Sequence, residues 1–461
     1  MRLSREERAR HGRSVRDELP LEDHAQLVTA DRPDPVDLLE SQAEVRVSDL
    51  VPIRYGRMVA SPFAHYRGGA LLMAADLARS PHTGLRVQLC GDAHLSNFGV
   101  YSSPERHLVF DINDFDETYP GPFEWDVKRL AASLQVAGES SGFTAKERRT
   151  MVRRAVRGYR EAMRGFAEEG NLTVWYSHLD VEDLLPRIGK RFDAERQDRV
   201  QILLDKARKR DSLHALSKLT TMVEGQPRIV SQPPLVVPVE ELWGEAAAAE
   251  THARFHDLVQ SYSQSLPRDR RHLIAEFDLV HVARKVVGVG SVGTRAWILL
   301  FQGLDAGDPL FLQAKEAQAS VLAAYLPPAP ATTEGERVVT GQQLMQASTD
   351  IFLGWDRILA PDGVERDFYV RQLRDGKGSV PVEELRAEGM TYYGRICGEA
   401  LARAHARSGD RVAIAAYLGS SDRFDHAVAD FAEAYAELNT RDHAALAAAI
   451  RSGRITAQTG V

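Results

Sequence analysis

The sequence predicts an α+β protein in which helices dominate the first half of the chain and an antiparallel sheet follows later. Apolar residues recur at helical spacing over three early segments, residues 63–78, 124–134 and 145–169. Short runs rich in Val, Ile, Leu, Phe and Trp, separated by glycine-containing turns, cover residues 279–287, 294–302 and 310–315. The composition, with 44% hydrophobic and 27% charged residues, is typical of a globular chain with a sizeable core.

The order of these patterns predicts four units along the chain. Residues 1–50 form a charged N-terminal extension, in which prolines break any long helix. Residues 51–275 form a mainly helical lobe that carries the polar loops described below. Residues 276–380 form an antiparallel-sheet lobe, and the Ala-rich helices of residues 381–461 are expected to return to the helical lobe.

The remaining elements are predicted from the same periodicities. Short apolar strands are expected over residues 87–90, 108–110, near 352–355 and over 367–373. An extended segment or edge strand is expected between the prolines of residues 227–238. Further helices are expected over residues 194–222, 245–265, 342–351, 383–407 and 422–450.

Composition and charge exclude several classes of protein. A net charge of -7 over 461 residues gives no support for nucleic-acid binding as the main activity. The two cysteines, Cys90 and Cys397, are too few for a disulfide framework and favour a reducing compartment. No stretch approaches the roughly 20 apolar residues that a membrane helix needs, and the N-terminus lacks the apolar core of a signal peptide. We therefore expect a cytoplasmic protein that binds neither nucleic acid nor membrane.

Two polar clusters follow predicted strands, at residues 91–97 and 111–117. In phosphoryl-transfer enzymes of the kinase type, an Asp accepts the proton of the acceptor hydroxyl, and an Asn and a second Asp hold magnesium on the nucleotide phosphates. Asp92 followed five positions later by Asn97, and then by a strand ending at Asp111, has this pattern. Asp114 could replace Asp111 as the metal ligand, because the loop length does not separate the two.

The crowding of carboxylates in the second cluster indicates a bound cation. Asp111, Asp114 and Asp116 cannot all be buried and ionised together, because like charges at close range raise one another's pKa. Magnesium prefers one or two carboxylates together with phosphate oxygens and water. His94 is interpreted as a structural loop residue. Asp126, at the start of the helix over residues 124–134, either caps that helix or holds the catalytic loop through backbone N–H groups.

A Gly-x-Gly-x-x-Gly run lies at residues 288–293, where Gly288, Gly290, Ser291 and Gly293 are candidate phosphate-binding residues. The run alone is a weak signal. A dinucleotide-binding fold needs a helix after the glycines, but a strand is predicted here. Strand, glycine loop and strand is the kinase-type cover over ATP phosphates, and Lys315 ends the next strand, where kinases keep the phosphate-contacting lysine. The alternative is an ordinary glycine hairpin with a surface lysine.

These motifs carry two resemblances. Gly91-Asp92 with Asn97, the strand ending at Asp111, and Trp125-Asp126-Val127 opening a helix resemble the catalytic segment of the aminoglycoside phosphotransferase branch of the protein-kinase-like superfamily. The second resemblance is carried by residues 54–58, 89–94, 113–118, 128–133 and 402–410. Through these segments the chain as a whole resembles an uncharacterised bacterial family, domain-of-unknown-function family 2252.

The kinase resemblance implies a two-lobe fold with its parts in permuted order. In kinases the glycine loop and its lysine precede the catalytic Asp, whereas here Gly288 and Lys315 follow Asp92. A circular permutation would preserve the site, because a site is assembled in space. The resemblance also implies an adenine-binding hinge near residues 371–373, including Gln372. The glutamate partner of Lys315 stays open: Glu316 is adjacent in sequence, and adjacent strand residues point to opposite faces.

The sequence therefore predicts an ATP- and magnesium-dependent phosphotransferase that acts on an unidentified hydroxyl-bearing small molecule or protein. Transfer of the nucleotidyl group would use the same parts. One alternative is a metal-dependent phosphoesterase, whose ligands for one or two metals would be Asp92, His94, Asn97, Asp111 and Asp114. Another is a nucleotide-binding pseudokinase without catalysis.

Overall fold

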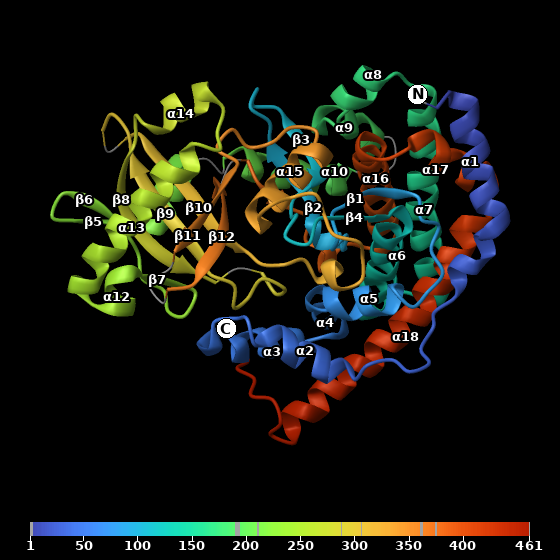
Figure 1. The fold of residues 1–461 in the computed structure, drawn as a ribbon, viewed down its shortest axis with the longest axis horizontal. Helices are drawn as coiled ribbons and strands as arrows, with labels where there is room; N and C mark the ends of the chain where they lie inside the picture. The colour runs from blue at the N-terminus through green and yellow to red at the C-terminus, as the bar shows by residue number, and fades with distance from the viewer. Residues whose placement is uncertain are drawn as a thin grey trace.

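A computed structural model describes residues 3–189, 194–209, 212–286, 288–305, 307–359, 363–373 and 376–460. The fold is mixed, with 54% helix and 16% strand, and its sheets are antiparallel, as the sequence predicted. Figure 1 shows a large sheet on one side of the molecule and a body of helices on the other. Among the described residues, no helix is both long enough and apolar enough to cross a membrane.

The helices and strands follow one another along the chain with these bounds. The helices are α1 Arg5–Glu18, α2 Pro35–Ala43, α3 Val51–Met58, α4 Pro62–Gly68, α5 Ala70–Leu77, α6 Phe123–Ser140, α7 Ala145–Glu168, α8 Asn171–Tyr176, α9 Val181–Gly189, α10 Ala194–Arg208, α11 Ser212–Leu219, α12 Val239–Trp243, α13 Glu245–Ser263, α14 Arg268–Ile274, α15 Glu334–Met345, α16 Ala387–Ser408, α17 Arg411–Leu418 and α18 Arg423–Arg451. The strands are β1 Arg86–Leu89, β2 Phe98–Ser102, β3 Leu108–Ile112, β4 Tyr119–Pro122, β5 Thr220–Val223, β6 Gln226–Ile229, β7 Val236–Pro238, β8 Asp278–Lys285, β9 Ala296–Gln302, β10 Pro309–Ala317, β11 Gly354–Leu359, β12 Glu365–Gln372 and β13 Gly378–Ser379.

The large sheet has six strands in the order β11-β12-β10-β9-β8-β7, and every neighbouring pair is antiparallel. Strands β8, β9 and β10 are consecutive neighbours, which confirms the meander predicted over residues 279–315. One face is covered by α13, whose Phe255, Leu258 and Tyr262 join the apolar residues of the strands in one core cluster. Residues 239–274 therefore pack with the sheet, although the sequence had grouped them with the helical lobe.

The helical body surrounds a second, larger apolar core. Helix α16 packs against α7 and α6, and the long α18 crosses both α6 and α7. Helix α1 lies along α17, so the N-terminal extension wraps the outside of this body (Figure 1). The C-terminal tail runs back to α3, where the N–H of Gln458 donates to the carbonyl of Pro52 at 2.8 Å.

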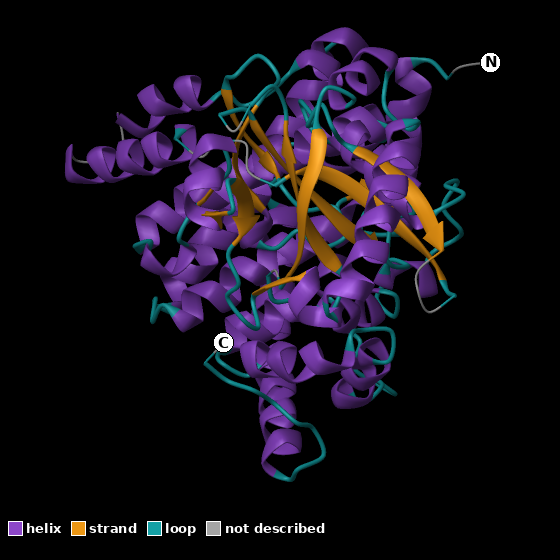
Figure 2. Ribbon diagram, turned by 90° about the vertical axis from the view of Figure 1, so that its left-hand side faces the viewer, coloured by secondary structure: helices purple, strands orange, loops and turns teal. Residues whose placement is uncertain are grey.

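Two small sheets connect the body with the large sheet. Strand β1 pairs with β4, and β13, β2 and β3 form a three-stranded sheet in that order. Strand β13 follows β12 along the chain, so the exit from the large sheet leads directly into the small one. Figure 2 shows the strands gathered in the middle of the molecule with helices around them. The polar loops that follow β1 and β3 therefore lie near the centre of the fold.

Three predicted helices differ from the observed ones. The helix expected over residues 63–78 is broken into α4 and α5, because two successive glycines, Gly68 and Gly69, interrupt it. The single helix expected over residues 194–222 is divided into the helices α10 and α11, and its last residues belong to the strand β5. The helix expected over residues 342–351 is α15, which begins at Glu334 because the hydroxyl of Thr333 accepts a hydrogen bond from the backbone of Glu336 at 3.1 Å.

Candidate active site

A cavity of about 970 Å³ opens where three loops meet. The loop after β1, the acidic run after β3 and the glycine loop between β8 and β9 all line it. Residues of the predicted site that line the cavity are Asp92, Asn97, Asp114, Gly288, Gly290 and Ser291. The fold thus brings together groups that lie in two distant parts of the sequence.

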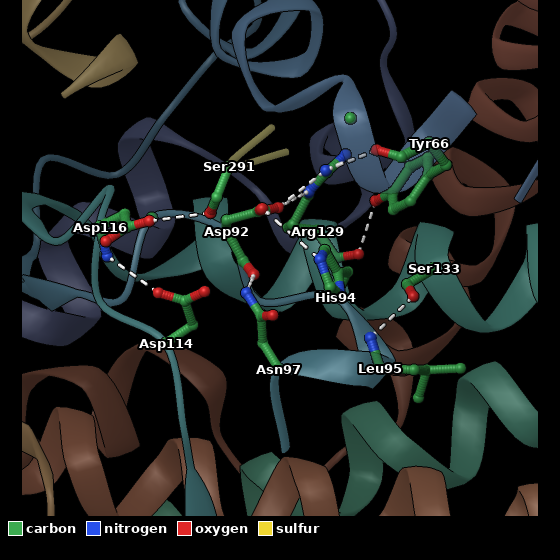
Figure 3. A network of polar contacts seen from close by, with 12 residues as sticks. Tyr66, Asp92, His94, Leu95, Asn97, Asp114, Asp116, Arg129, Ser133 and Ser291 are labelled. Atoms are coloured by element: carbon green, nitrogen blue, oxygen red, sulfur yellow. Dashed lines mark hydrogen bonds and ion pairs between the residues drawn. The ribbon is translucent and has the colours of Figure 1, made fainter. Parts of the chain in front are cut away.

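Helix α6 holds the loop after β1 with three polar side chains on one face. The carboxylate of Asp126 accepts hydrogen bonds from the backbone N–H groups of Cys90 and Gly91, at 2.7 and 3.1 Å. The hydroxyl of Ser133 accepts from the N–H of Leu95 at 2.9 Å (Figure 3). Positions 126, 129 and 133 are spaced as one helical face, and the third residue, Arg129, contacts Asp92. Of the two predicted roles of Asp126, the structure confirms the second, in which it holds the loop.

The turn at Gly91 requires glycine. Its φ is +82°, in the left-handed region, and a Cβ atom placed there would lie 2.1 Å from the carbonyl oxygen of Glu117. The loop that carries Asp92 is therefore packed directly against the end of the acidic run. This contact keeps the two polar clusters next to each other.

Asp92 lines the cavity and is bonded by Arg129 of α6. Its Oδ1 accepts a hydrogen bond from the Nε atom of Arg129 at 2.8 Å and forms an ion pair with the Nη2 atom at the same distance. The guanidinium of Arg129 also stacks over the ring of Tyr66, with its central carbon 3.9 Å from the ring centre. Burial raises the pKa of Asp92 above its ordinary value, and Arg129 offsets part of this effect. Asp92 Oδ2 is the oxygen that remains for a ligand in the cavity.

His94 lies beside Asp92 but does not bond its carboxylate. The Nε2 atom of His94 is 3.6 Å from Asp92 Oδ2, which is too long for a hydrogen bond. Burial lowers the pKa of His94 well below its usual range, and the nearby Arg129 and Arg67 lower it further. The side chain is therefore neutral at physiological pH, as a structural loop residue would be.

Asn97 and Asp114 both line the cavity, and Figure 3 draws them below Asp92. The amide nitrogen of Asn97 donates to the backbone carbonyl of Asp92 at 2.7 Å, so its amide oxygen is the atom that a cation would contact. Burial raises the pKa of Asp114, and the neighbouring carboxylate of Asp116 raises it further. A cation would relieve this unfavourable charge.

Asp111, by contrast, is directed away from the cavity. It is 1% exposed, and both of its oxygens accept hydrogen bonds from Arg403 of α16, at 2.8 and 2.7 Å. The N–H of Ala347 donates to Asp111 Oδ2 at 2.9 Å. The expectation that Asp111 binds magnesium beside Asn97 does not fit this arrangement, because a buried arginine already neutralises it. Of the two aspartates that the sequence left open, Asp114 is the one in the cavity.

Lys315, in β10, is not among the residues that line the cavity, but it reaches the acidic run that does. Its ammonium group forms an ion pair with Asp116 Oδ2 and donates to the hydroxyl of Ser291 at 2.9 Å. The hydroxyl of Tyr369 donates to Asp116 Oδ1 at 2.7 Å. Burial alone would raise the pKa of Asp116, but the Lys315 ammonium holds it below its ordinary value. The pKa of Lys315 is raised in turn, since Asp116 outweighs the effect of burial.

The partner of Lys315 is therefore an aspartate and not a glutamate. Glu316 points to the other face of the strand, as expected, and bonds Arg295 at 3.2 Å. Helix α15 contains two glutamates, and Glu334 forms an ion pair with Arg337 of the same helix. Arg337 in turn donates to the carbonyl oxygen of Asp116 at 2.9 Å, so α15 supports the acidic run through its arginine.

The glycine loop is fastened to the N-terminal part of the chain. Arg57 donates to the carbonyl of Gly288, and Arg46 donates to the carbonyl of Val292. The carbonyl of Gly293 accepts from the N–H of Val47 at 2.8 Å, and a Cβ at Gly293 would press on the side chain of Arg46. Gly293 consequently sits at the base of the loop, outside the cavity that Gly288 and Gly290 line.

Gln372 also lies outside the cavity. It ends β12, where it pairs with Leu312 of β10, and its backbone N–H donates to Asp350. The expected adenine contact at Gln372 is therefore not part of the cavity that Asp92 and the glycine loop share. The chain beyond it leads to β13 and the small sheet.

Two residues of the site were not singled out from the sequence: Arg129, which binds Asp92, and Arg67 of α4, which lines the cavity. Asp116 was named only as a member of the acidic run, and its bonds to Lys315 and Ser291 were not predicted. For Arg129 a signal existed, because Asp126, Arg129 and Ser133 are polar residues at helical spacing in a mostly apolar helix. For Arg67 no signal was visible, since its place depends on how α4 packs against the rest of the fold.

Residues 46–449 match the family described as "Uncharacterized protein conserved in bacteria (DUF2252)", and the chain belongs to this family. Searches of curated proteins and of solved structures found no match. The family membership predicted from the sequence is thus confirmed, while the resemblance to kinases stays a prediction.

Proposed function

We propose that this protein is an ATP- and magnesium-dependent phosphotransferase with a kinase-like site. The observation that carries the proposal is the cavity itself, in which Asp92, Asn97 and Asp114 face a glycine loop whose Ser291 is bonded by Lys315. Phosphoryl-transfer enzymes of the kinase type combine the same groups around one nucleotide.

The order of elements in the large sheet supports a two-lobe, permuted, protein-kinase-like fold. The glycine loop joins β8 to β9, the lysine lies in the next strand β10, and helix α15 follows before β11 and β12. Kinases place the glycine loop over the phosphates and the lysine on the third strand. Here this unit follows the loops of Asp92 and Asp114 in the sequence, which is the permutation that we propose.

In the proposed reaction, the acceptor hydroxyl attacks the γ-phosphorus of ATP. The bond from that oxygen to phosphorus forms, the bond to the β–γ bridging oxygen breaks, and ADP leaves. Asp92 Oδ2 orients the hydroxyl and takes its proton, which passes to solvent. Lys315 and the backbone of Gly288 and Gly290 hold the phosphates.

Magnesium, when bound, neutralises charge on the phosphate oxygens. Asn97 and Asp114 are the residues that would hold it. Within the described ranges, no group of three or more His, Cys, Asp or Glu side chains could hold a metal ion. Two protein ligands beside phosphate oxygens and water suit magnesium, which seldom uses an all-protein cage.

The same observation gives no support to the phosphoesterase alternative. That reading needs Asp92, His94 and Asp111 to act as metal ligands, but Arg129 and Arg403 already bind the two carboxylates. It also leaves Lys315 and the glycine loop without a role. A pseudokinase that binds nucleotide without catalysis keeps one supporting feature, since Asp92 Oδ1 is engaged by Arg129. The acceptor stays unidentified, and nucleotidyl transfer stays an alternative to phosphoryl transfer. The cytoplasmic location stays a prediction.

Calorimetric titration with the non-hydrolysable analogue AMPPNP tests the proposal. We expect wild-type protein to bind AMPPNP with magnesium and to lose this binding when EDTA removes the metal. Lys315→Met should weaken binding by about 10- to 100-fold, because it removes charge-assisted hydrogen bonds to phosphate. The exposed Lys146→Met is the matched control and should bind as wild type does. Absence of magnesium-dependent binding to folded wild-type protein would refute the proposal.

A further inference from the structure

Arg67 occupies a position between the two halves of the candidate site. It lies near the end of α4, lines the cavity, and acts electrostatically on both Asp92 and His94. Its carbonyl oxygen would lie 3.4 Å from a Cβ atom built on Gly290. Its backbone is therefore next to the glycine loop, while its charged end faces the candidate base.

The guanidinium of Arg67 has no protein counter-ion within the described part of the chain. Its Nε atom is buried without a hydrogen-bond partner, and no ion pair joins it to Asp92 or to Glu383, the two carboxylates that act on its pKa. The charges of Arg129 and Arg403, by contrast, are neutralised by Asp92 and by Asp111.

A buried cation without a counter-ion is costly unless an anion from outside completes the site. The cavity in front of Arg67 is the place from which such an anion can come. A second arginine, Arg46, lines the same cavity and also has a buried Nε atom without a partner. Arg67 and Arg46 therefore place two positive charges on the wall of a cavity that Asp114 and Asp116 also line.

We propose that Arg67, in α4, is a catalytic residue that contacts the phosphoryl group during transfer and stabilises its negative charge. This inference rests on the proposed function. If the glycine loop covers the phosphates and Asp92 binds the acceptor hydroxyl, a side chain between the two faces the γ-phosphoryl group.

During transfer, negative charge gathers on the equatorial oxygens of the phosphoryl group while the bond to ADP breaks and the bond to the acceptor oxygen forms. The N–H groups of Arg67 can donate to these oxygens in a bidentate manner, which suits guanidinium geometry. Arg67 neither gains nor loses a proton, because Asp92 accepts the proton of the hydroxyl. An arginine in this role contributes about 10³-fold or more to the rate in other phosphoryl-transfer enzymes.

A transition-state analogue tests this without knowledge of the acceptor. Binding of ADP and magnesium is measured by calorimetry with and without aluminium fluoride, which mimics the phosphoryl group in transfer. We expect aluminium fluoride to tighten ADP binding to the wild type by roughly 100-fold or more. Arg67→Gln should bind ADP and magnesium alone within about threefold of wild type, and should lose most of the fluoride effect.

Two further variants keep the result interpretable. Arg67→Lys retains the charge without the bidentate geometry and should recover only part of the fluoride effect. The exposed Arg13→Gln, in α1, is the control and should behave as wild type. Retained ADP affinity in Arg67→Gln shows that this variant is folded.

The outcomes separate the two proposals. If wild-type protein fails to bind ADP with magnesium, the proposed function is wrong and this inference is wrong with it. If wild type binds ADP but Arg67→Gln keeps the full fluoride effect, the phosphotransferase proposal stands and the role of Arg67 is refuted.

Discussion

Asp111 and Asp114 are separated by two residues, yet the fold gives them opposite environments. Asp111 lies in the buried strand β3 and is neutralised by Arg403, whereas Asp114 lines the cavity, where burial and Asp116 raise its pKa. The negative charge of Asp111 is balanced by Arg403, whereas no arginine or lysine bonds Asp114 among the described residues. Their substitutions should therefore affect different properties.

Asp111→Asn should lower the free energy of unfolding by about 3 kcal/mol or more, because it leaves the charge of Arg403 buried without a counter-ion. Asp114→Asn should change stability by less than about 0.5 kcal/mol, since the ionised form of Asp114 is already disfavoured. The magnesium-dependent affinity for AMPPNP should show the reverse pattern, with roughly a tenfold loss only in Asp114→Asn. Urea unfolding and calorimetry on the two variants measure both quantities.

A loss of magnesium dependence in folded Asp111→Asn, with wild-type behaviour in Asp114→Asn, would contradict the metal site that we propose.

The sequence could not choose between these aspartates, because both follow the same predicted strand and the choice depends on Arg403. That arginine lies on α16, far along the chain, and only the packed fold shows which carboxylate it reaches.

At the level of secondary structure, helix α6 determines the shape of the loop that carries Asp92. Asp126, Arg129 and Ser133 lie on one face of α6, and each forms a hydrogen bond with a different residue of that loop. The sequence predicted this helix and left two roles open for Asp126, of which the structure shows the one that holds the loop. It did not predict the role of Ser133, because the hydroxyl of Ser133 bonds Leu95 only when the loop is folded against α6.

Ser133→Ala should destabilise the protein by about 2 kcal/mol, because the buried N–H of Leu95 would lose its acceptor. The same change should speed hydrogen exchange at residues 92–97 more than in the rest of the helical body. Urea unfolding and hydrogen exchange followed by mass spectrometry measure the two effects. Ser140→Ala, exposed at the other end of α6, is the control, and equal effects of the two substitutions would argue against a loop-holding role.

Over the whole molecule, most of the strands and helices could be predicted, because hydrophobic periodicity reports local structure. The meander of β8, β9 and β10 and the helices α6, α7, α13, α16 and α18 agree with the sequence. The failures share one cause, which is tertiary packing. The pairing of Lys315 with Asp116 links distant parts of the chain, and the placement of Arg67 under the glycine loop depends on α4 and on the N-terminal segment together.

Asp116 is one of the places where the large sheet and the helical body meet through polar contacts. Lys315, Ser291 and Tyr369, all from the sheet and its glycine loop, bind this one carboxylate. A nucleotide in the cavity would touch both sides of this junction, since the glycine loop and the loop of Asp92 line the same space. Binding should therefore stabilise both parts of the molecule and not the sheet alone.

At a concentration of AMPPNP and magnesium about 100 times the dissociation constant, the folded state should gain about 2.7 kcal/mol. Amides that exchange only through global opening should then slow by about 100-fold in β9 and β10 and equally in α6 and α16. Hydrogen exchange with and without ligand measures this, and Lys315→Met at the same ligand concentration is the control. Slowing confined to the sheet would mean that the nucleotide binds the sheet alone, because a ligand that also contacts Asn97 and Asp114 cannot leave the helical body unaffected.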